Sequence, residues 1–117
     1  MQIDIQAHGF VLSEDLRAHV EQRLLFALTR FQDRMVRVAV RLSDVNGGPR
    51  GEVDRHCLLQ VRLRGLPDLV VRDTQADIRI AVDRAAERAG RTLGRYLRRA
   101  RGVFDNPLTW SDHERIE

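Results

Sequence analysis

Arginines carry the most distinctive chemistry in this chain, and they are concentrated in one segment. Residues 78–101 contain eight arginines against only two acidic residues, Asp83 and Glu87, whereas residues 1–77 sum to zero charge. All 20 basic residues of the chain are arginine, and codon bias by itself can produce such a composition. Arginine presents a planar fork of donors that matches phosphate oxygens, and it stacks on bases. The imbalance in this segment therefore points to a polyanionic partner.

The spacing of these arginines predicts that they share one face of a helix. The segment from Asp77 to Arg101 is typical of a long helix. At a rotation of about 100° per residue, its basic and apolar side chains fall on two separate stripes of the helix surface. The basic stripe consists of Arg84, Arg88, Arg91, Arg95, Arg98 and Arg99. The apolar stripe, which we expect to face the core, consists of Ile78, Val82, Ala85, Ala89, Leu93, Tyr96 and Ala100. The basic stripe then forms a linear array of guanidinium groups about 20 Å long.

Three explanations of this basic stripe are open: a solvated face, an anionic membrane surface and a nucleic acid. A solvated face normally mixes both signs of charge at i,i+4 spacing, and here only Asp83 and Glu87 offset the arginines. A membrane surface would need exposed bulky residues, but the apolar stripe is needed for the core. Nucleic acid fits best, because each neutralised phosphate releases counterions and adds affinity.

Arginines of an earlier predicted helix either extend this surface or are ordinary solvated residues. They include Arg23 and Arg30, which share one flank of that helix. The sequence has no helix-turn-helix, zinc finger or paired aromatic strand motif, so we expect binding to RNA backbone and shape, without DNA sequence specificity. Aromatic residues make up only 5% of the chain, so base-stacking platforms are not expected.

The elements that must position these arginines indicate one α+β domain. A length of 117 residues corresponds to a single domain, and 43% hydrophobic and 32% charged residues are typical of a folded globule. Hydrophobic periodicity predicts strands near residues 2–6, 36–42, 56–64 and 69–73, and helices near residues 14–34 and 77–101. Residues 43–54 are expected to form a loop, and residues 65–68 a turn.

The order β-α-β-β-β-α favours an antiparallel hairpin sheet of four strands, with both helices packed on one face. We expect the α+β domain to span residues 1–101. An acidic C-terminal tail, residues 102–117 with net charge −3, follows it.

Other features lead us to expect a non-catalytic cytoplasmic protein without a cofactor or metal. The N-terminus lacks a basic segment followed by an apolar one, which would indicate a signal peptide. The single cysteine, Cys57, lies in an apolar register and excludes an internal disulfide framework. The four histidines show no metal-binding spacing, and His56 points away from Cys57 on the predicted strand. No nucleophile–base set or carboxylate pair stands out.

Local sequence and element order together resemble a known family, the short ribosome-hibernation factors. These are also called ribosomal subunit interface proteins or sigma-54 modulation proteins. The resemblance covers about residues 1–101. It includes the Met-Gln-apolar-polar-Ile start at Met1, the helix start Ser13-Glu14-Asp15-Leu16-Arg17, and Asp77-Ile78-Arg79-Ile80-Ala81-Val82-Asp83. The last segment is similar to a family pattern Asp-apolar-Tyr-x-Ala-Ile-Asp.

The resemblance implies a ribosome-associated translation inhibitor that is not an enzyme. Members bind small-subunit ribosomal RNA near the decoding centre through the basic surface of their helices, and exclude mRNA and tRNA. Family basic positions correspond here to Arg88, Arg91 and Arg95, and a family core leucine corresponds to Leu93. Long members carry an additional C-terminal domain that pairs ribosomes. We expect this chain to be too short to contain that domain.

This chain departs from the family pattern at several positions. Arg79 replaces a tyrosine, Phe26 stands roughly where lysine is common, and Gly90 and Gly94 are smaller than usual. Leu25, Phe26 and Trp110 are candidates for an apolar contact of the tail with its domain or of one chain with another.

The alternative function is therefore a non-catalytic interaction module of the same fold that has lost ribosome binding and self-associates near Phe26. A weak homodimer is part of this alternative. It predicts covered or paired arginines and a salt-resistant oligomer, whereas ribosome binding needs the same arginines open to solvent.

Overall fold

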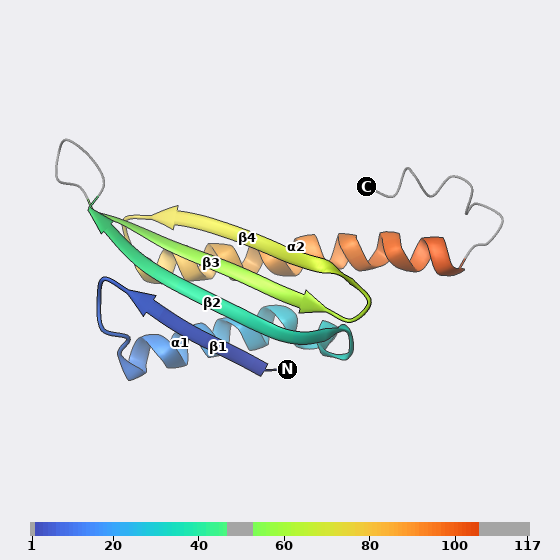
Figure 1. The fold of residues 1–117 in the computed structure, drawn as a ribbon, viewed down its shortest axis with the longest axis horizontal. Coiled ribbons are helices and arrows are strands. Elements are labelled where there is room, and N and C mark those ends of the chain that lie inside the picture. Colours follow the sequence, from blue (N-terminus) through green and yellow to red (C-terminus); the bar gives the residue numbers. More distant parts are fainter. Residues whose placement is uncertain (1, 47–52, 106–117) are drawn as a thin grey trace.

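The computed structural model describes residues 2–46 and 53–105, and its elements follow the predicted order (Figure 1). They are β1 (Gln2–His8), α1 (Glu14–Leu28), the 3-10 helix η1 (Thr29–Arg34), β2 (Met35–Asn46), β3 (Val53–Leu63), β4 (Leu66–Gln75) and α2 (Ile78–Asp105). The α+β architecture, with four strands in one sheet and two long helices, confirms the predicted fold class.

The four strands lie in chain order across the sheet, but their directions correct one expectation. The hairpin-linked strands β2, β3 and β4 are antiparallel, as predicted, whereas β1 pairs with β2 in parallel. Ile3 stands opposite Val38, and Ile5 stands opposite Val40. The reason is the connection: α1 carries the chain back along the sheet, and such a crossover makes the two flanking strands parallel. The sheet is therefore mixed.

The two central strands are longer than hydrophobic alternation alone indicates. β2 continues to Asn46 and β3 begins at Val53, so the expected loop 43–54 is shorter than predicted. Asp44 stands opposite Arg55, and their side chains form an ion pair at 3.5 Å, which extends the ladder with polar residues. The next turn is also tighter than expected: β4 already begins at Leu66, directly after Gly65, whose φ of +73° suits glycine. The middle of the expected loop, residues 47–52, lies outside the described residues.

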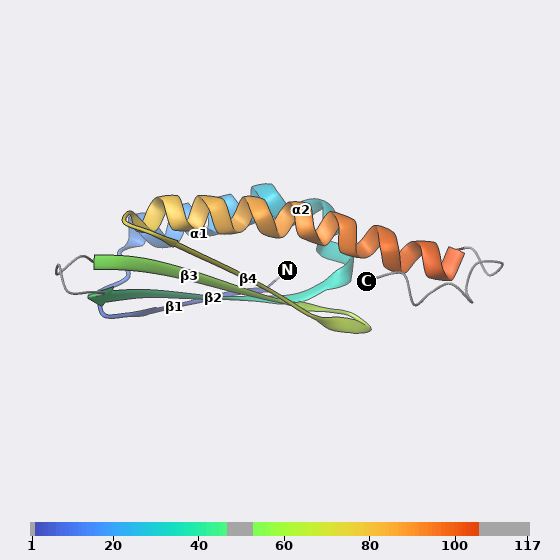
Figure 2. The ribbon, with the colours of Figure 1, turned by 90° about the horizontal axis from the view of Figure 1, so that it is seen from above.

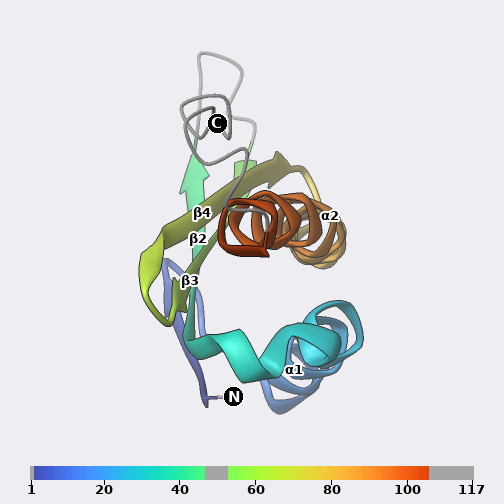
Figure 3. The ribbon, with the colours of Figure 1, turned by 90° about the vertical axis from the view of Figure 1, so that its right-hand side faces the viewer.

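Both long helices cover the same face of the sheet, as predicted (Figure 2). Seen along the molecule, α2 and α1 lie side by side in one layer against the sheet (Figure 3). Ser13 caps α1, since its hydroxyl accepts a 3.1 Å hydrogen bond from the Leu16 amide. The core lies between the layers and combines inward-facing strand residues with one stripe from each helix. Its buried residues include Val20, Leu24 and Leu28 of α1, and Val38, Val40, Leu42, Leu59 and Val61 of the strands.

The buried stripe of α2 is wider than the wheel predicts. Val82, Ala85, Ala89 and Leu93 are buried as expected, whereas Ile78 and Tyr96 are only partly buried. The structure also buries Ala81, Ala86 and Leu97. The extra width follows from two contacts, because α2 packs on β3 and β4 with one side and on α1 with another. The side chain of Ala100 lies outside the described part.

The C-terminal end of α2 differs slightly from the prediction. α2 continues to Asp105, four residues beyond the expected helix end at Arg101. The remainder of the predicted acidic tail, including Trp110, lies outside the described residues. No helix in the described ranges is long and apolar enough to cross a membrane.

Candidate nucleic-acid interface

The predicted basic stripe lies on the solvent side of α2. All six of its arginines, Arg84, Arg88, Arg91, Arg95, Arg98 and Arg99, are exposed. The position of the stripe follows from packing, because the small and apolar residues of α2 face the sheet and α1 and so turn these arginines outward. The arginines differ, however, in the partners that they find within the protein.

Arg88 is held by the neighbouring strand. Its Nη2 donates to Oδ1 of Asp73 at 2.8 Å, and its Nη1 donates to the backbone carbonyl of Arg72. The Asp73 side chain is only 8% exposed and also accepts a hydrogen bond from Gln75 Nε2 at 3.0 Å. A buried carboxylate needs such partners to remain charged at low cost. Arg88 therefore has a structural role, although its side chain is still partly exposed.

Arg91 forms a weaker internal contact. Its Nη1 lies 3.3 Å from Oε1 of Glu87, one turn earlier on α2, and both side chains are 64% exposed. Such an exposed i,i+4 pair contributes about 0.3–0.5 kcal/mol, so it is easily exchanged for another anion. Arg91 thus stays accessible to a ligand.

The remaining four arginines of the stripe differ from Arg88 and Arg91 in their surroundings. Arg84, Arg95, Arg98 and Arg99 have no carboxylate in ion-pair range within the part of the chain that the structure describes. Like charges along one helix face repel one another and are tolerated more easily when counterions or a polyanion neutralise them. These four residues form the uncompensated part of the predicted site.

The arginines of the first predicted helix, Arg23 of α1 and Arg30 of η1, reach the same side of the molecule. Arg23 is half-buried, and its Nε lies 3.2 Å from Oδ1 of Asp83 on α2, within ion-pair range but without hydrogen-bond geometry. The same oxygen lies 2.7 Å from Nε2 of His19. Arg30 is exposed and lies over the Phe31 ring, 4.6 Å from its centroid. The structure thus brings Arg23 and Arg30 next to α2.

A groove between α1 and α2 gathers these side chains. It has a volume of about 350 Å³ and is lined by Arg23, Phe26, Ala27, Arg30, Glu87, Gly90 and Arg91. The helices approach closely at its floor: a Cβ on Gly90 would lie 3.0 Å from the backbone oxygen of Ala27. By sequence alone Gly90 is only a departure that weakens a helix, by about 1 kcal/mol relative to alanine. The structure explains why glycine stands at this position: α1 and α2 cross there and leave little space for a side chain.

Phe26 stands at the rim of this groove with 83% of its surface exposed. The guanidinium carbon of Arg23 lies 5.9 Å from the centroid of its ring. Neighbouring Leu25 is 48% exposed, so both residues lie outside the core. The predicted contact of these residues with Trp110 involves a residue outside the described ranges.

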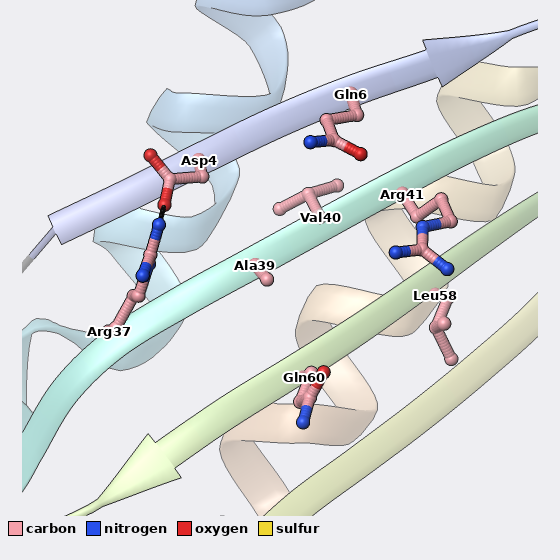
Figure 4. Close-up of a pocket in the computed structure, with 8 residues that line it drawn as sticks. All are labelled: Asp4, Gln6, Arg37, Ala39, Val40, Arg41, Leu58 and Gln60. Atoms are coloured by element: carbon pink, nitrogen blue, oxygen red, sulfur yellow. Dashed lines mark hydrogen bonds and ion pairs between the residues drawn. The ribbon is translucent and has the colours of Figure 1, made fainter.

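The opposite face of the sheet carries a second, smaller hollow of about 130 Å³ (Figure 4). Its lining residues are Asp4, Gln6, Arg37, Ala39, Val40, Arg41, Leu58 and Gln60. Two arginines on this face of the sheet have acidic partners: Arg37 in the hollow pairs with Asp4, and Arg62 beside it lies 4.0 Å from Asp68. These pairs offset part of the positive charge on this face.

The expected separation of His56 and Cys57 is confirmed. His56 Nδ1 lies 2.8 Å from the Thr74 hydroxyl, whereas Cys57 is buried in the core. Burial and the charge of Asp73 raise the pKa of Cys57 to about 12, so its thiol stays protonated near neutral pH. Among residues 2–46 and 53–105, no group of three or more His, Cys, Asp or Glu side chains is placed to hold a metal ion.

The roles of two residues are not evident from the sequence reasoning. That reasoning places Asp73 only at a strand end, yet it continues the inward alternation of Leu69 and Val71 and binds Arg88. An acid in an inward register is the signal that could have indicated a buried ion pair with an arginine. The sequence marks Phe26 as an apolar residue where the family commonly has lysine, but only the structure shows its position beside Arg23 and the groove.

Comparison with known proteins shows one family and two solved structures to which this chain is similar. The family described as "Sigma 54 modulation protein / S30EA ribosomal protein" matches residues 3–101. The N-terminal domain of protein Y from Thermus thermophilus is similar, with 27% sequence identity and a TM-score of 0.66, over 82% of this chain and 99% of that one. A ribosomal subunit interface protein from Coxiella burnetii gives a TM-score of 0.68 at 18% identity, over 82% and 97% of the two chains, a likeness of fold alone. A search of curated proteins gave no match.

Proposed function

Because the chain belongs to the sigma 54 modulation protein / S30EA ribosomal protein family, we propose that it associates with the ribosome and binds RNA of the small subunit. The binding surface is the arginine face of α2, extended by Arg23 of α1 and Arg30 of η1. Following the family resemblance, we place the binding site near the decoding centre, where the bound protein excludes mRNA and tRNA and so inhibits translation.

One observation carries this proposal: four exposed arginines follow one side of α2 and, in the described ranges, lack an acidic partner. Arg84 and Arg99 are 15 positions apart, which corresponds to about 22 Å along a helix. A row of guanidinium groups of this length matches several successive phosphates of an RNA backbone. The alternative, a self-associating module, predicts covered or paired arginines, and these four are open to solvent in the structure.

The test is co-sedimentation of the purified protein with small ribosomal subunits over a salt series. If four phosphates are neutralised, affinity should fall on the order of 100-fold between 50 and 200 mM salt. The informative variant is Arg84→Glu/Arg95→Glu, because both side chains are exposed and lack internal partners in the described ranges. Arg88 is left intact, since its substitution would also leave Asp73 without its partner.

A matched control reverses the same number of charges on the other side of the molecule. Arg41→Glu/Arg72→Glu changes two exposed arginines on the open face of the sheet and gives the same net charge. We expect the α2 variant to lose binding and the control variant to keep most of it. Equal loss in both variants would mean that net charge, and not the α2 face, determines binding. Absence of binding at low salt would refute the proposed function.

A further inference from the structure

The groove between α1 and α2 combines an exposed aromatic ring with a one-sided set of charges. We propose that it holds an unpaired RNA base stacked on the ring of Phe26, with the adjacent phosphates contacted by Arg23, Arg30 and Arg91. This inference rests on the RNA-binding function proposed above and names what the groove recognises. It also revises the expectation, drawn from the low aromatic content, that the chain has no stacking platform.

The first argument is the state of the Phe26 ring. With 83% of its surface exposed, the residue contributes little to the core, and one ring edge or face is free for a ligand. Arg23 lies 5.9 Å from the ring centroid and is itself held near Asp83 at 3.2 Å, so the ring has an anchored neighbour on α1. An aromatic ring presented in this way offers a π-face on which any base can stack.

The second argument is charge. The groove is lined by three arginines and a single glutamate, and Arg91 belongs both to the groove and to the basic stripe of α2. A chain of phosphates along the stripe therefore passes the rim of the groove. Glu87 adds an acceptor at this rim, and carboxylates accept hydrogen bonds from exocyclic amino groups of bases.

The same charges disfavour a second copy of the chain as the occupant. A two-fold interface places the same surface patch of both subunits together. Around Phe26 that symmetry would bring arginine against arginine, which costs free energy unless anions intervene. A nucleotide, which joins an aromatic ring to an anion, complements both features of the groove.

The third argument is space. The floor consists of Ala27 and Gly90, and the absence of a side chain on Gly90 keeps it low. A volume of about 350 Å³ lies at the lower end of the range for small-molecule sites and suits one planar ring with its sugar. The limited size of the site beside Phe26 favours a single base over a folded peptide segment.

The test compares a polyanion that carries bases with one that carries none. Affinity is measured for an oligoadenylate of about 12 nucleotides and for inorganic polyphosphate of similar charge, at one low salt concentration. Phe26→Leu removes the aromatic ring but keeps an apolar side chain, and Phe26→Trp keeps a stacking surface. Leu25→Ala serves as the control, because it trims exposed apolar surface next to Phe26 but outside the groove.

We expect Phe26→Leu to weaken oligoadenylate binding about 10-fold, within the range found for one base–aromatic stack, and to leave polyphosphate binding unchanged. Phe26→Trp should bind oligoadenylate at least as well as the unmodified protein, and Leu25→Ala should bind both polyanions normally. Arg84→Glu/Arg95→Glu should weaken both polyanions together.

Three results would overturn the base site. These are unchanged oligoadenylate affinity in Phe26→Leu, an equal loss for polyphosphate, or a dimer in solution that Phe26→Leu converts to monomers. The experiments also distinguish failure of the base-site proposal from failure of the proposed ribosomal function. If Phe26 does not affect oligoadenylate while small subunits still bind, only the base site is wrong. If small subunits do not bind but the Phe26 effect is present, only the ribosomal function is wrong.

Discussion

Arg88 of α2 donates a 2.8 Å hydrogen bond to the nearly buried carboxylate of Asp73 on β4. This pair fastens the middle of the basic helix to the edge strand of the sheet, and a second bond from Arg88 reaches the backbone of Arg72. One arginine of the predicted binding stripe is thus used to hold the helix that presents the others.

Replacing Arg88 should therefore affect stability before it affects binding. In Arg88→Ala the Asp73 carboxylate keeps its hydrogen bond from Gln75 but loses its charged partner at Oδ1. Leaving a buried polar atom unpaired costs about 1–3 kcal/mol. Urea unfolding of this variant should show that loss, whereas Arg84→Ala should stay within about 0.5 kcal/mol of the unmodified protein. Arg88→Ala/Asp73→Asn should recover part of the loss. A stability of Arg88→Ala equal to that of Arg84→Ala would contradict the structural role.

The salt dependence of binding should distinguish the arginines individually. Each phosphate contact contributes about 0.7–0.9 to the slope of log affinity against log salt concentration. Arg84→Ala and Arg95→Ala should each reduce the slope for small subunits by about that amount. Arg88→Ala should change the slope less, because its guanidinium is already neutralised by Asp73. The measurement is a binding titration of each variant at several salt concentrations, and identical slopes for all three would argue against this division.

The two glycines of α2 offer a matched test of the helix crossing. Gly94→Ala should stabilise the protein by up to about 1 kcal/mol, since alanine is the better helix former and a Cβ there meets its nearest neighbours at 3.5 Å or more. Gly90→Ala has the same gain in propensity, but its Cβ would lie 3.0 Å from the backbone oxygen of Ala27. We expect it to be less stable than Gly94→Ala by at least about 1 kcal/mol, measured by thermal or urea unfolding. Equal stabilisation would show that α1 moves away without cost.

Cys57 should make stability fall at alkaline pH. Its pKa is raised from the ordinary value of 9.0 to about 12 in the folded protein, so above pH 9 the unfolded chain releases a proton that the folded chain retains. The protonated Cys57 thiol contributes fully to the free energy of unfolding below pH 9. As pH rises toward 12 this free energy falls, by at most about 1.4 kcal/mol per pH unit.

Urea unfolding between about pH 8.5 and 10.5, beside Cys57→Ala as control, measures this decline. The steeper dependence should belong to the unmodified protein. A thiol reagent should also react with Cys57 at about pH 8 only after unfolding. Rapid reaction in the native state would contradict the buried, protonated thiol.

Local patterns were sufficient for much of this molecule because they act over a few residues. Alternation in Val36–Leu42 indicated β2, and the helix start at Ser13-Glu14-Asp15-Leu16-Arg17 indicated the beginning of α1. The 100° spacing separated the basic and apolar sides of α2. The order of these elements then favoured two helices on one face of a four-stranded sheet, which the structure confirms. These features follow from side-chain periodicity and backbone geometry, which a single sequence displays directly.

Tertiary structure decided the features that depend on which segments meet. The parallel pairing of β1 with β2 follows from the path of the crossover through α1, and the extension of β2 and β3 through Asp44 and Arg55 follows from their ladder. The space required at Gly90 exists only because α1 crosses there.

The division of the arginines has the same origin. By sequence alone, Arg84 and Arg88 are equivalent members of one stripe, determined by the 3.6-residue period of the helix. Only packing shows that Arg88 faces the carboxylate of Asp73 on another element while Arg84 faces water. Charge and periodicity are properties of the chain, but the partner of each charge depends on contacts between residues distant in sequence, and those contacts form only when the chain folds.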